Sequence, residues 1–231
     1  MKYNVVLWDM DGTLLNYKAA QKEALTQVFR TIHKPLTDDM RELYSQINDA
    51  YWEKLELGEV TREELLYGRF ETFFEQVGIE GVDVAMVRDK YEEVLGSVYE
   101  YIQDSLGLCT VLKNKCKQYV VTNGVSELQR KKFKLSGFAD CMDGCFVSEE
   151  VGTEKPNAGF FDTVFSEIPD LDKEKTLIVG DSLTSDIKGG HMAGIKTCYF
   201  NPQHKKLTGE YKPDYEIDHL WDVLRICDFV L

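Results

Sequence analysis

Short runs of hydrophobic residues, each bounded by polar or turn residues, recur along the chain. They cover residues 4–8, 119–121, 145–148, 176–179 and 197–200. The runs are rich in Val, Ile, Leu and aromatic residues without strict alternation with polar residues, which is typical of strands covered on both faces of a parallel sheet. We therefore predict that these runs form the strands of a parallel sheet.

Between the later runs the hydrophobic spacing changes to that of helices. The segments that fit this spacing are 127–135, 158–168, 185–193 and 220–231. The last of them would bury Leu220, Leu224 and either Cys227 or Ile226. Strands that alternate with helices predict an α/β fold, a doubly wound core with helices on both faces of the sheet.

Residues 17–100 interrupt this alternation, because they carry four helical patterns and no convincing strand. The third pattern opens with Thr61-Arg-Glu-Glu64, which is typical of a capping box, and ends before Gly78. We predict an all-α module of residues 17–100, inserted after the first strand. Residues 1–16 and 101–231 then form the core together.

Composition limits the classes of partner. The 231 residues include 27 basic and 40 acidic side chains, a formal net charge of −13, and 43% of the chain is hydrophobic. This content of hydrophobic residues predicts a folded globular protein. The acidic balance argues against a nucleic acid polymer as partner, because phosphate backbones are bound by Lys and Arg patches. A small anionic ligand remains possible, since one metal ion and a few directed donors overcome the overall field locally.

The cysteines and the apolar runs indicate a compartment. None of the six cysteines stands in a C-x-x-C pair or has His at zinc spacing, so we expect buried free thiols in a reducing environment. The first apolar run is stopped by Asp9 too early for a signal peptide, and no apolar stretch approaches the roughly 18 residues of a membrane span. We expect a cytoplasmic protein with no membrane partner.

The strongest chemical signal is Asp9-Met10-Asp11-Gly12-Thr13, directly after the first predicted strand. Ligands of open α/β sheets bind at the carboxyl ends of the strands, where these side chains fall. Two neighbouring carboxylates attract a divalent cation, or separate their pKa values so that one acts as an acid. Gly12 lets the chain turn sharply away.

Polar residues also follow three other predicted strands. Asp181 and Asp186 follow the strand 176–179 and fit the other half of a site for Mg²⁺, which takes carboxylate, carbonyl and water oxygens. Thr122 and Asn123 follow the strand 119–121 and offer a hydroxyl and backbone N–H groups to an anion, and Lys155 follows the strand 145–148. Because carboxyl ends of parallel strands meet at one edge, we predict that these side chains converge.

With these motifs, the sequence resembles the haloacid dehalogenase superfamily of phosphotransferases along essentially its whole length. Asp9 to Thr13 looks like its first motif, Thr122 its second, Lys155 its third, and Gly180-Asp181 to Asp186 its fourth. The inserted helices look like its helical cap. Within the superfamily, further stretches are similar to the pyrimidine 5′-nucleotidase group: Tyr51-Trp52, Gly58, Gly68-Arg69-Phe70-Glu71, Ser148 to Gly152, Lys155-Pro-Asn157 and Asp181 to Asp186.

The resemblance implies a Rossmann-like three-layer core, Mg²⁺ and an aspartyl-phosphate intermediate. Asp9 would be the nucleophile and Asp11 the general acid and base. The metal would be held by Asp9, the Asp11 carbonyl and Asp181, with Asp186 orienting Lys155 or a metal-bound water. Thr122, Asn123 and Lys155 would bind the phosphate.

The expected substrate is a phosphate monoester, a nucleoside 5′-monophosphate with pyrimidine and deoxy forms preferred. Tyr51, Trp52 and Arg69 of the cap are candidates for contacting it. For these residues the alternatives stay open, because cap aromatics also pack the cap's own core and Arg69 also fits an ion pair with a cap acid. The sequence leaves the oligomeric state open.

Two other functions compete with this hypothesis. One is a capped phosphatase or phosphomutase acting on a small sugar phosphate or phosphoglycolate; many sugar-phosphate members have Asp where this chain has Asn16, which disfavours the phosphomutase. The other is a phospho-aspartate signalling protein without turnover. Receiver domains share the acidic cluster, Thr and Lys, but lack a large insertion and need no Asp two residues after the nucleophile.

Overall fold

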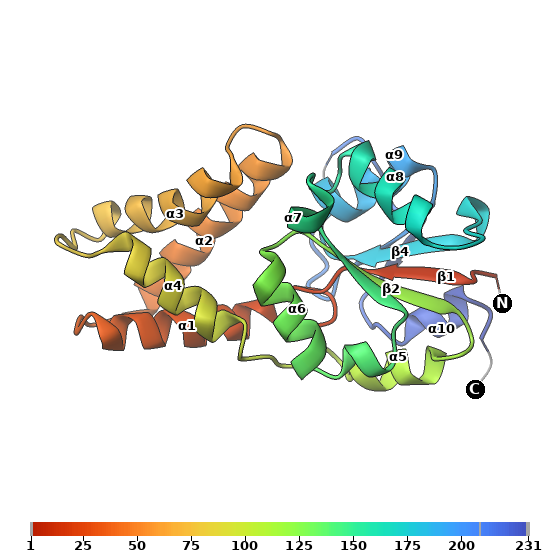
Figure 1. Ribbon diagram of the computed structural model, residues 1–231, viewed down its shortest axis with the longest axis horizontal. Helices are drawn as coiled ribbons and strands as arrows, with labels where there is room; N and C mark the ends of the chain where they lie inside the picture. Colours follow the sequence, from red (N-terminus) through yellow and green to blue (C-terminus); the bar gives the residue numbers. More distant parts are fainter. Residues whose placement is uncertain (1, 208, 230–231) are drawn as a thin grey trace. The chain divides into compact units, whose positions relative to one another are not determined.

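The computed structural model describes residues 2–207 and 209–229. The chain divides into two compact units, one formed by Met1–Asn16 together with Glu100–Leu231, the other by Tyr17–Tyr99. The first unit holds the sheet, and the second is helical (Figure 1).

Six strands of the described chain form one sheet in which every pairing is parallel, in the order β3-β2-β1-β4-β5-β6. The strands are β1 (Val5–Trp8), β2 (Lys117–Thr122), β3 (Gly144–Val147), β4 (Thr176–Gly180), β5 (Lys196–Phe200) and β6 (Tyr215–Ile217). The predicted parallel α/β fold is confirmed, with β1 at the centre. Strand β6 was not predicted, because it has three residues and exposes Glu216 at the edge of the sheet.

Helices cover both faces of this sheet (Figure 1). They are α5 (Ser105–Leu112), α6 (Ser126–Leu135), α7 (Ser148–Val151), α8 (Ala158–Glu167), α9 (Lys188–Ala193) and α10 (Asp222–Ile226). The predicted helix 185–193 is divided into a π-helical turn, η3 (Leu183–Ile187), and α9. The 3₁₀ turns are η1 (Phe138–Asp140) and η2 (Lys173–Lys175).

The alternation of side chains along β1 divides the core. Val5 and Leu7 pack with Phe160 and Val164 of α8 on one face of the sheet. On the other face Trp8 donates its indole N–H to Gln118 Oε1 at 3.2 Å. Such double-sided burial explains the continuous apolar runs of the strands.

The end of the chain differs from its prediction. Helix α10 spans only Asp222–Ile226, and residues 230–231 of the predicted helix lie outside the described part. Leu220, Leu224 and Cys227 are buried, so Cys227 and not Ile226 completes the inward face. All six cysteines are free, as expected, and Cys116 alone among them is incompletely buried.

The helical unit contains α1 (Tyr17–Thr31), α2 (Asp38–Glu56), α3 (Arg62–Gln76) and α4 (Val84–Leu95). The predicted capping box is confirmed, since the Thr61 hydroxyl accepts from Glu64 N and Glu64 accepts from Thr61 N. Tyr44 of α2 lies at the centre of an aromatic core, 5.3 Å from the Phe70 ring and 5.5 Å from the Tyr91 ring.

Within residues 2–207 and 209–229, we find no helix with both the length and the apolar character that crossing a bilayer requires.

Candidate active site

The two carboxylates after β1 have different surroundings. The backbone of Asp9 continues the sheet, because its N–H donates to Val179 O of β4 at 2.9 Å. The Asp9 side chain is buried, and burial raises its pKa well above the usual range although Lys155 lies beside it. Asp11 is one-fifth exposed and contacts side chains of α6. The two groups are therefore suited to different tasks.

Lys155 joins three acceptors at the edge of the sheet. Its ammonium donates to Asp9 Oδ1 at 2.9 Å, to Asp186 Oδ1 at 2.6 Å and to Val121 O at 2.7 Å. Burial disfavours the charged form of this lysine, but the carboxylates of Asp186 and Asp9 raise its pKa. Lys155 is thus a buried cation held against Asp9.

The residues after β4 bring a further carboxylate against the loop of β1. Asp181 Oδ1 accepts from the Thr13 hydroxyl at 3.2 Å. The backbone of Gly12, at φ +99°, lies so close to Asp181 that a Cβ there would be 2.5 Å from Oδ2. Desolvation and the neighbouring Asp186 raise the pKa of Asp181 to about 7. Only glycine allows this approach.

Oxygen atoms of Asp9, Asp181 and Asp186 lie within 4.8 Å of one another, which is a spacing that a metal ion can span. Burial raises the pKa values of Asp9 and Asp181, and a neighbouring cation would favour their charged forms. Hard oxygen donors of this kind fit Mg²⁺. Asp186 differs from the other two, because its oxygens already accept from Lys155 Nζ and Ser182 N.

The predicted phosphate ligands lie beside these carboxylates. Thr122 ends β2, and its hydroxyl accepts from Gln129 Nε2 at 2.7 Å. The side chain of Asn123 is used differently: its Oδ1 accepts from Lys155 N and its Nδ2 donates to Lys155 O, both at 2.9 Å. Asn123 therefore fixes the backbone that carries Lys155.

Two residues of the site were missed from the sequence, namely Gln129 and Lys132 of α6. Both contact Asp11 and are buried. They are three residues apart, which places them on the same face of a helix. The spacing alone could have suggested that the two side chains lie together on α6. It does not show whether that face of the helix is buried or exposed to solvent.

The three residues predicted as candidates for contacting the substrate, Tyr51, Trp52 and Arg69, all lie in the helical unit. Tyr51 donates to or accepts from Thr72 Oγ1 at 3.0 Å, and its ring lies where a side chain at Gly68 would be. Arg69 is buried, donates to Asn48 Oδ1 at 2.9 Å and lies 3.8 Å from Glu92. These contacts fit the ion-pair alternative for Arg69. Trp52 is half-buried.

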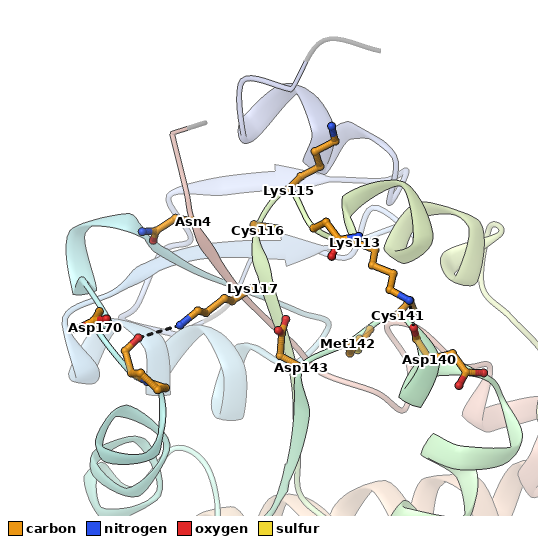
Figure 2. A pocket seen from close by; sticks show the side chains of 12 residues that line it. Asn4, Lys113, Lys115, Cys116, Lys117, Asp140, Cys141, Met142, Asp143 and Asp170 are labelled. Atoms are coloured by element: carbon orange, nitrogen blue, oxygen red, sulfur yellow. Dashed lines mark hydrogen bonds between the residues drawn. The ribbon is translucent and has the colours of Figure 1, made fainter.

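A separate pocket lies at the opposite end of β2 (Figure 2). Two of its lysines donate to backbone carbonyls: Lys113 donates to Asp140 O at 2.6 Å and Lys117 to Pro169 O at 3.0 Å. The buried carboxylates and the buried lysine described above do not line this pocket. We therefore place the candidate active site at the carboxyl ends of the strands, where those groups lie.

Comparison with known proteins identifies the family of this chain. The family described as haloacid dehalogenase-like hydrolase matches residues 3–194. The chain belongs to this family of hydrolases. The HAD-hydrolase YfnB of Bacillus subtilis is 39% identical over 225 residues, covering 97% of this chain and 95% of that protein. The crystal structure of YfnB bound to magnesium superimposes with a TM-score of 0.94 at 38% identity, covering 99% of this chain and all of YfnB.

Two further relatives of this chain are nucleotidases. The pyrimidine 5′-nucleotidase PynA of Streptococcus pneumoniae is 33% identical over 229 residues, covering 99% of this chain and 96% of PynA. The pyrimidine 5′-nucleotidase YjjG of Escherichia coli is 27% identical over 223 residues, covering 96% of this chain and 97% of YjjG. The predicted resemblance to the superfamily is confirmed.

Proposed function

We propose that this chain is a Mg²⁺-dependent phosphomonoesterase that hydrolyses nucleoside 5′-monophosphates, preferring pyrimidine and deoxypyrimidine forms, through an aspartyl-phosphate. One observation carries the proposal: the buried carboxylate of Asp9 lies against the ammonium of Lys155 and within 4.8 Å of Asp181, at the edge where the first, third and fourth sequence motifs end. The similarity to PynA and YjjG supports the choice of substrate.

In the first half-reaction, an Asp9 oxygen would attack the phosphorus atom in line. A bond forms between that oxygen and phosphorus, and the bond from phosphorus to the leaving alkoxide breaks. Asp11, in its protonated form, would give its proton to the departing oxygen. Lys155 and Thr122 would hold the non-bridging oxygens, with a backbone N–H of the Asn123 turn.

In the second half-reaction, Asp11 would take a proton from a water molecule as the water attacks the phosphorus atom. The bond between phosphorus and Asp9 then breaks, which regenerates the carboxylate and releases phosphate. The same group serves first as acid and then as base, so it must stay near both the leaving oxygen and the incoming water.

The proposed Mg²⁺ ligands are Asp9, Asp181 and the backbone carbonyl of Asp11. When bound, the ion offsets the repulsion between carboxylates and phosphate and stabilises charge that develops on the transferring group. Asp186 is bound to Lys155 and Ser182, and its proposed role is to fix Lys155 in place.

The test is phosphate release from a panel of substrates, with Mg²⁺ and with chelator, using Asp9→Asn as the blank. The panel holds UMP, dUMP, dTMP, purine monophosphates, small sugar phosphates and phosphoglycolate. We expect preference for the pyrimidine nucleotides. Activity confined to sugar phosphates or phosphoglycolate would keep the chemistry and overturn the substrate. A long-lived phospho-Asp9 without turnover on any substrate would support the signalling alternative and overturn the proposal.

A further inference from the structure

Helix α6 carries two side chains directed at one carboxylate of the site. The ammonium of Lys132 donates to Asp11 Oδ1 at 2.8 Å and to Oδ2 at 3.0 Å. The amide of Gln129 donates to Asp11 Oδ2 at 3.0 Å. Both oxygens of Asp11 are therefore held by α6.

Gln129 also connects Asp11 to the end of β2, because its amide nitrogen donates to the Thr122 hydroxyl at 2.7 Å. The two hydrogens of that nitrogen are thus directed at the proposed acid–base group and at a proposed phosphate ligand. The Gln129 carbonyl oxygen is buried and has no hydrogen-bond partner within the described chain. Turning the amide over would place this acceptor against the carboxylate, so the observed orientation is the one that Asp11 requires.

The burial of these two residues sets them apart from an ordinary helix surface. Lys132 and Gln129 are each 1% exposed, while Lys131 and Lys134 on the same helix are exposed. Burying an ammonium group is costly unless it is paired with an opposite charge, and here the pairing is with both oxygens of Asp11. A lysine at a solvent-exposed helix position has neither this burial nor contacts with both oxygens of one carboxylate.

We infer that Lys132 and Gln129 are positioning residues that hold the Asp11 carboxylate in register with Thr122 for both proton transfers. The inference rests on the proposed function, since it takes Asp11 as the acid and base. A misplacement of about 1 Å in a reacting group costs about 100-fold in rate, so such positioning is large enough to measure. Because the pair acts through Asp11, its loss should reduce kcat more than it changes KM.

The experiment compares two leaving groups in the Mg²⁺-saturated protein. p-Nitrophenyl phosphate needs no acid for its leaving group, whereas the alkyl phosphate dUMP does. For Lys132→Met we expect kcat on dUMP to fall about 10- to 100-fold. With p-nitrophenyl phosphate we expect a burst of about one equivalent of p-nitrophenolate, followed by slow turnover because the second step still needs Asp11 as base. Lys132→Arg should retain most of the activity, since it restores a donor to both oxygens.

Matched variants separate positioning from a general structural defect. Lys134→Met, an exposed lysine of the same helix, should behave as wild type. Gln129→Met should repeat the burst even where Lys132→Met does not fold, because it leaves the lysine in place. Adding Lys132→Met to Asp11→Asn should lower kcat no further. Equal losses on both substrates without a burst, or unchanged kinetics, would overturn the inference.

Asp11→Asn distinguishes this failure from that of the proposed function. If Asp11→Asn shows the burst and the Lys132 and Gln129 variants do not, only the positioning role is wrong. If Asp11→Asn itself keeps wild-type turnover of dUMP, Asp11 is not the acid and base, and the proposed function fails with it.

Discussion

Lys155 donates to Asp9 Oδ1 at 2.9 Å across 146 residues of sequence, and both side chains are buried. The proposed nucleophile is therefore paired with the cation proposed to bind the phosphate. The same ammonium also donates to Asp186 Oδ1 at 2.6 Å, so Lys155 has a second carboxylate partner besides Asp9. This pairing leads to the first two predictions.

Replacing Asp9 with Asn should abolish turnover while the protein stays folded. The amide cannot form the acyl phosphate, but its oxygen can still accept from Lys155. We expect kcat to fall by at least about 10⁴-fold. Phosphate release and circular dichroism measured on the same preparation check both parts. Wild-type turnover by folded Asp9→Asn would contradict the assignment of the nucleophile.

Replacing Lys155 with Met should lower both stability and substrate affinity. It leaves Asp9 and Asp186 as buried carboxylates without their cation, which should cost about 3–5 kcal/mol of unfolding free energy. Urea unfolding at pH 8 measures this cost, and KM measures the lost phosphate contact. Lys155→Met combined with Asp186→Asn serves as control, because removing one of the two uncompensated charges should recover part of the stability. Unchanged KM and stability would remove Lys155 from the site.

Stabilisation by Mg²⁺ should depend on pH. The pKa of Asp181 is raised from 3.8 to about 7, so the folded, metal-free protein binds more protons than the unfolded chain between these values. The contribution of this group to stability is therefore lost as pH rises through about 7, while the deprotonated form is the one that binds a cation. We expect the increase in Tm on adding Mg²⁺ to be larger at pH 8 than at pH 5.5. Asp181→Asn should show a smaller pH dependence, because Asp9 is then the remaining proposed ligand whose pKa is raised. An equal increase at both pH values in wild type would contradict the prediction.

Replacing Gly12 with Ala should disturb Asp181. The new Cβ would lie 2.5 Å from Asp181 Oδ2, and the residue would also be strained at φ +99°. Gly194→Ala is the matched control, because φ is +76° there and no atom of residues 2–207 and 209–229 comes within 4 Å of the added carbon. Both variants should lose about 1–2 kcal/mol of stability from strain. Only Gly12→Ala should also lose activity and the rise in Tm with Mg²⁺; similar activity in the two variants would show that the contact with Asp181 is unimportant.

Replacing Trp52 with Ala tests whether this half-buried aromatic of α2 stacks on a nucleobase. Stacking contributes about 1–3 kcal/mol per base, so KM for UMP should rise about tenfold. KM for ribose 5-phosphate, which has no base, should stay the same. Tyr51→Phe, which keeps the ring and removes the hydroxyl that contacts Thr72, is the control. Equal changes for both substrates would assign Trp52 to packing of the helical unit.

Those site residues that directly follow a strand could be predicted from the sequence. Val5–Trp8 and Thr176–Gly180 are buried on both faces, so their apolar runs predicted strands, and the parallel pairing brought Asp9 and Asp181 together. Lys132 could not be predicted in this way, because whether a helical lysine meets solvent or a carboxylate depends on how the helix packs. Arg69 shows the same limit, since the sequence fits both a ligand contact and its observed bond to Asn48.

The two residues that flank the helical unit, Asn16 and Glu100, are hydrogen-bonded to each other. Asn16 N donates to Glu100 O at 2.8 Å, and Asn16 Nδ2 donates to Glu100 Oε1 at 2.8 Å. The two ends of the insertion are thus held together by hydrogen bonds that involve no residue of the insertion itself. We therefore expect that a linker of a few residues, or a different helical module, can replace residues 17–99 while β1 keeps its pairing with β2 and β4. Sequence changes within residues 17–99 would then leave the carboxylates, the lysine and the strands that carry them unchanged.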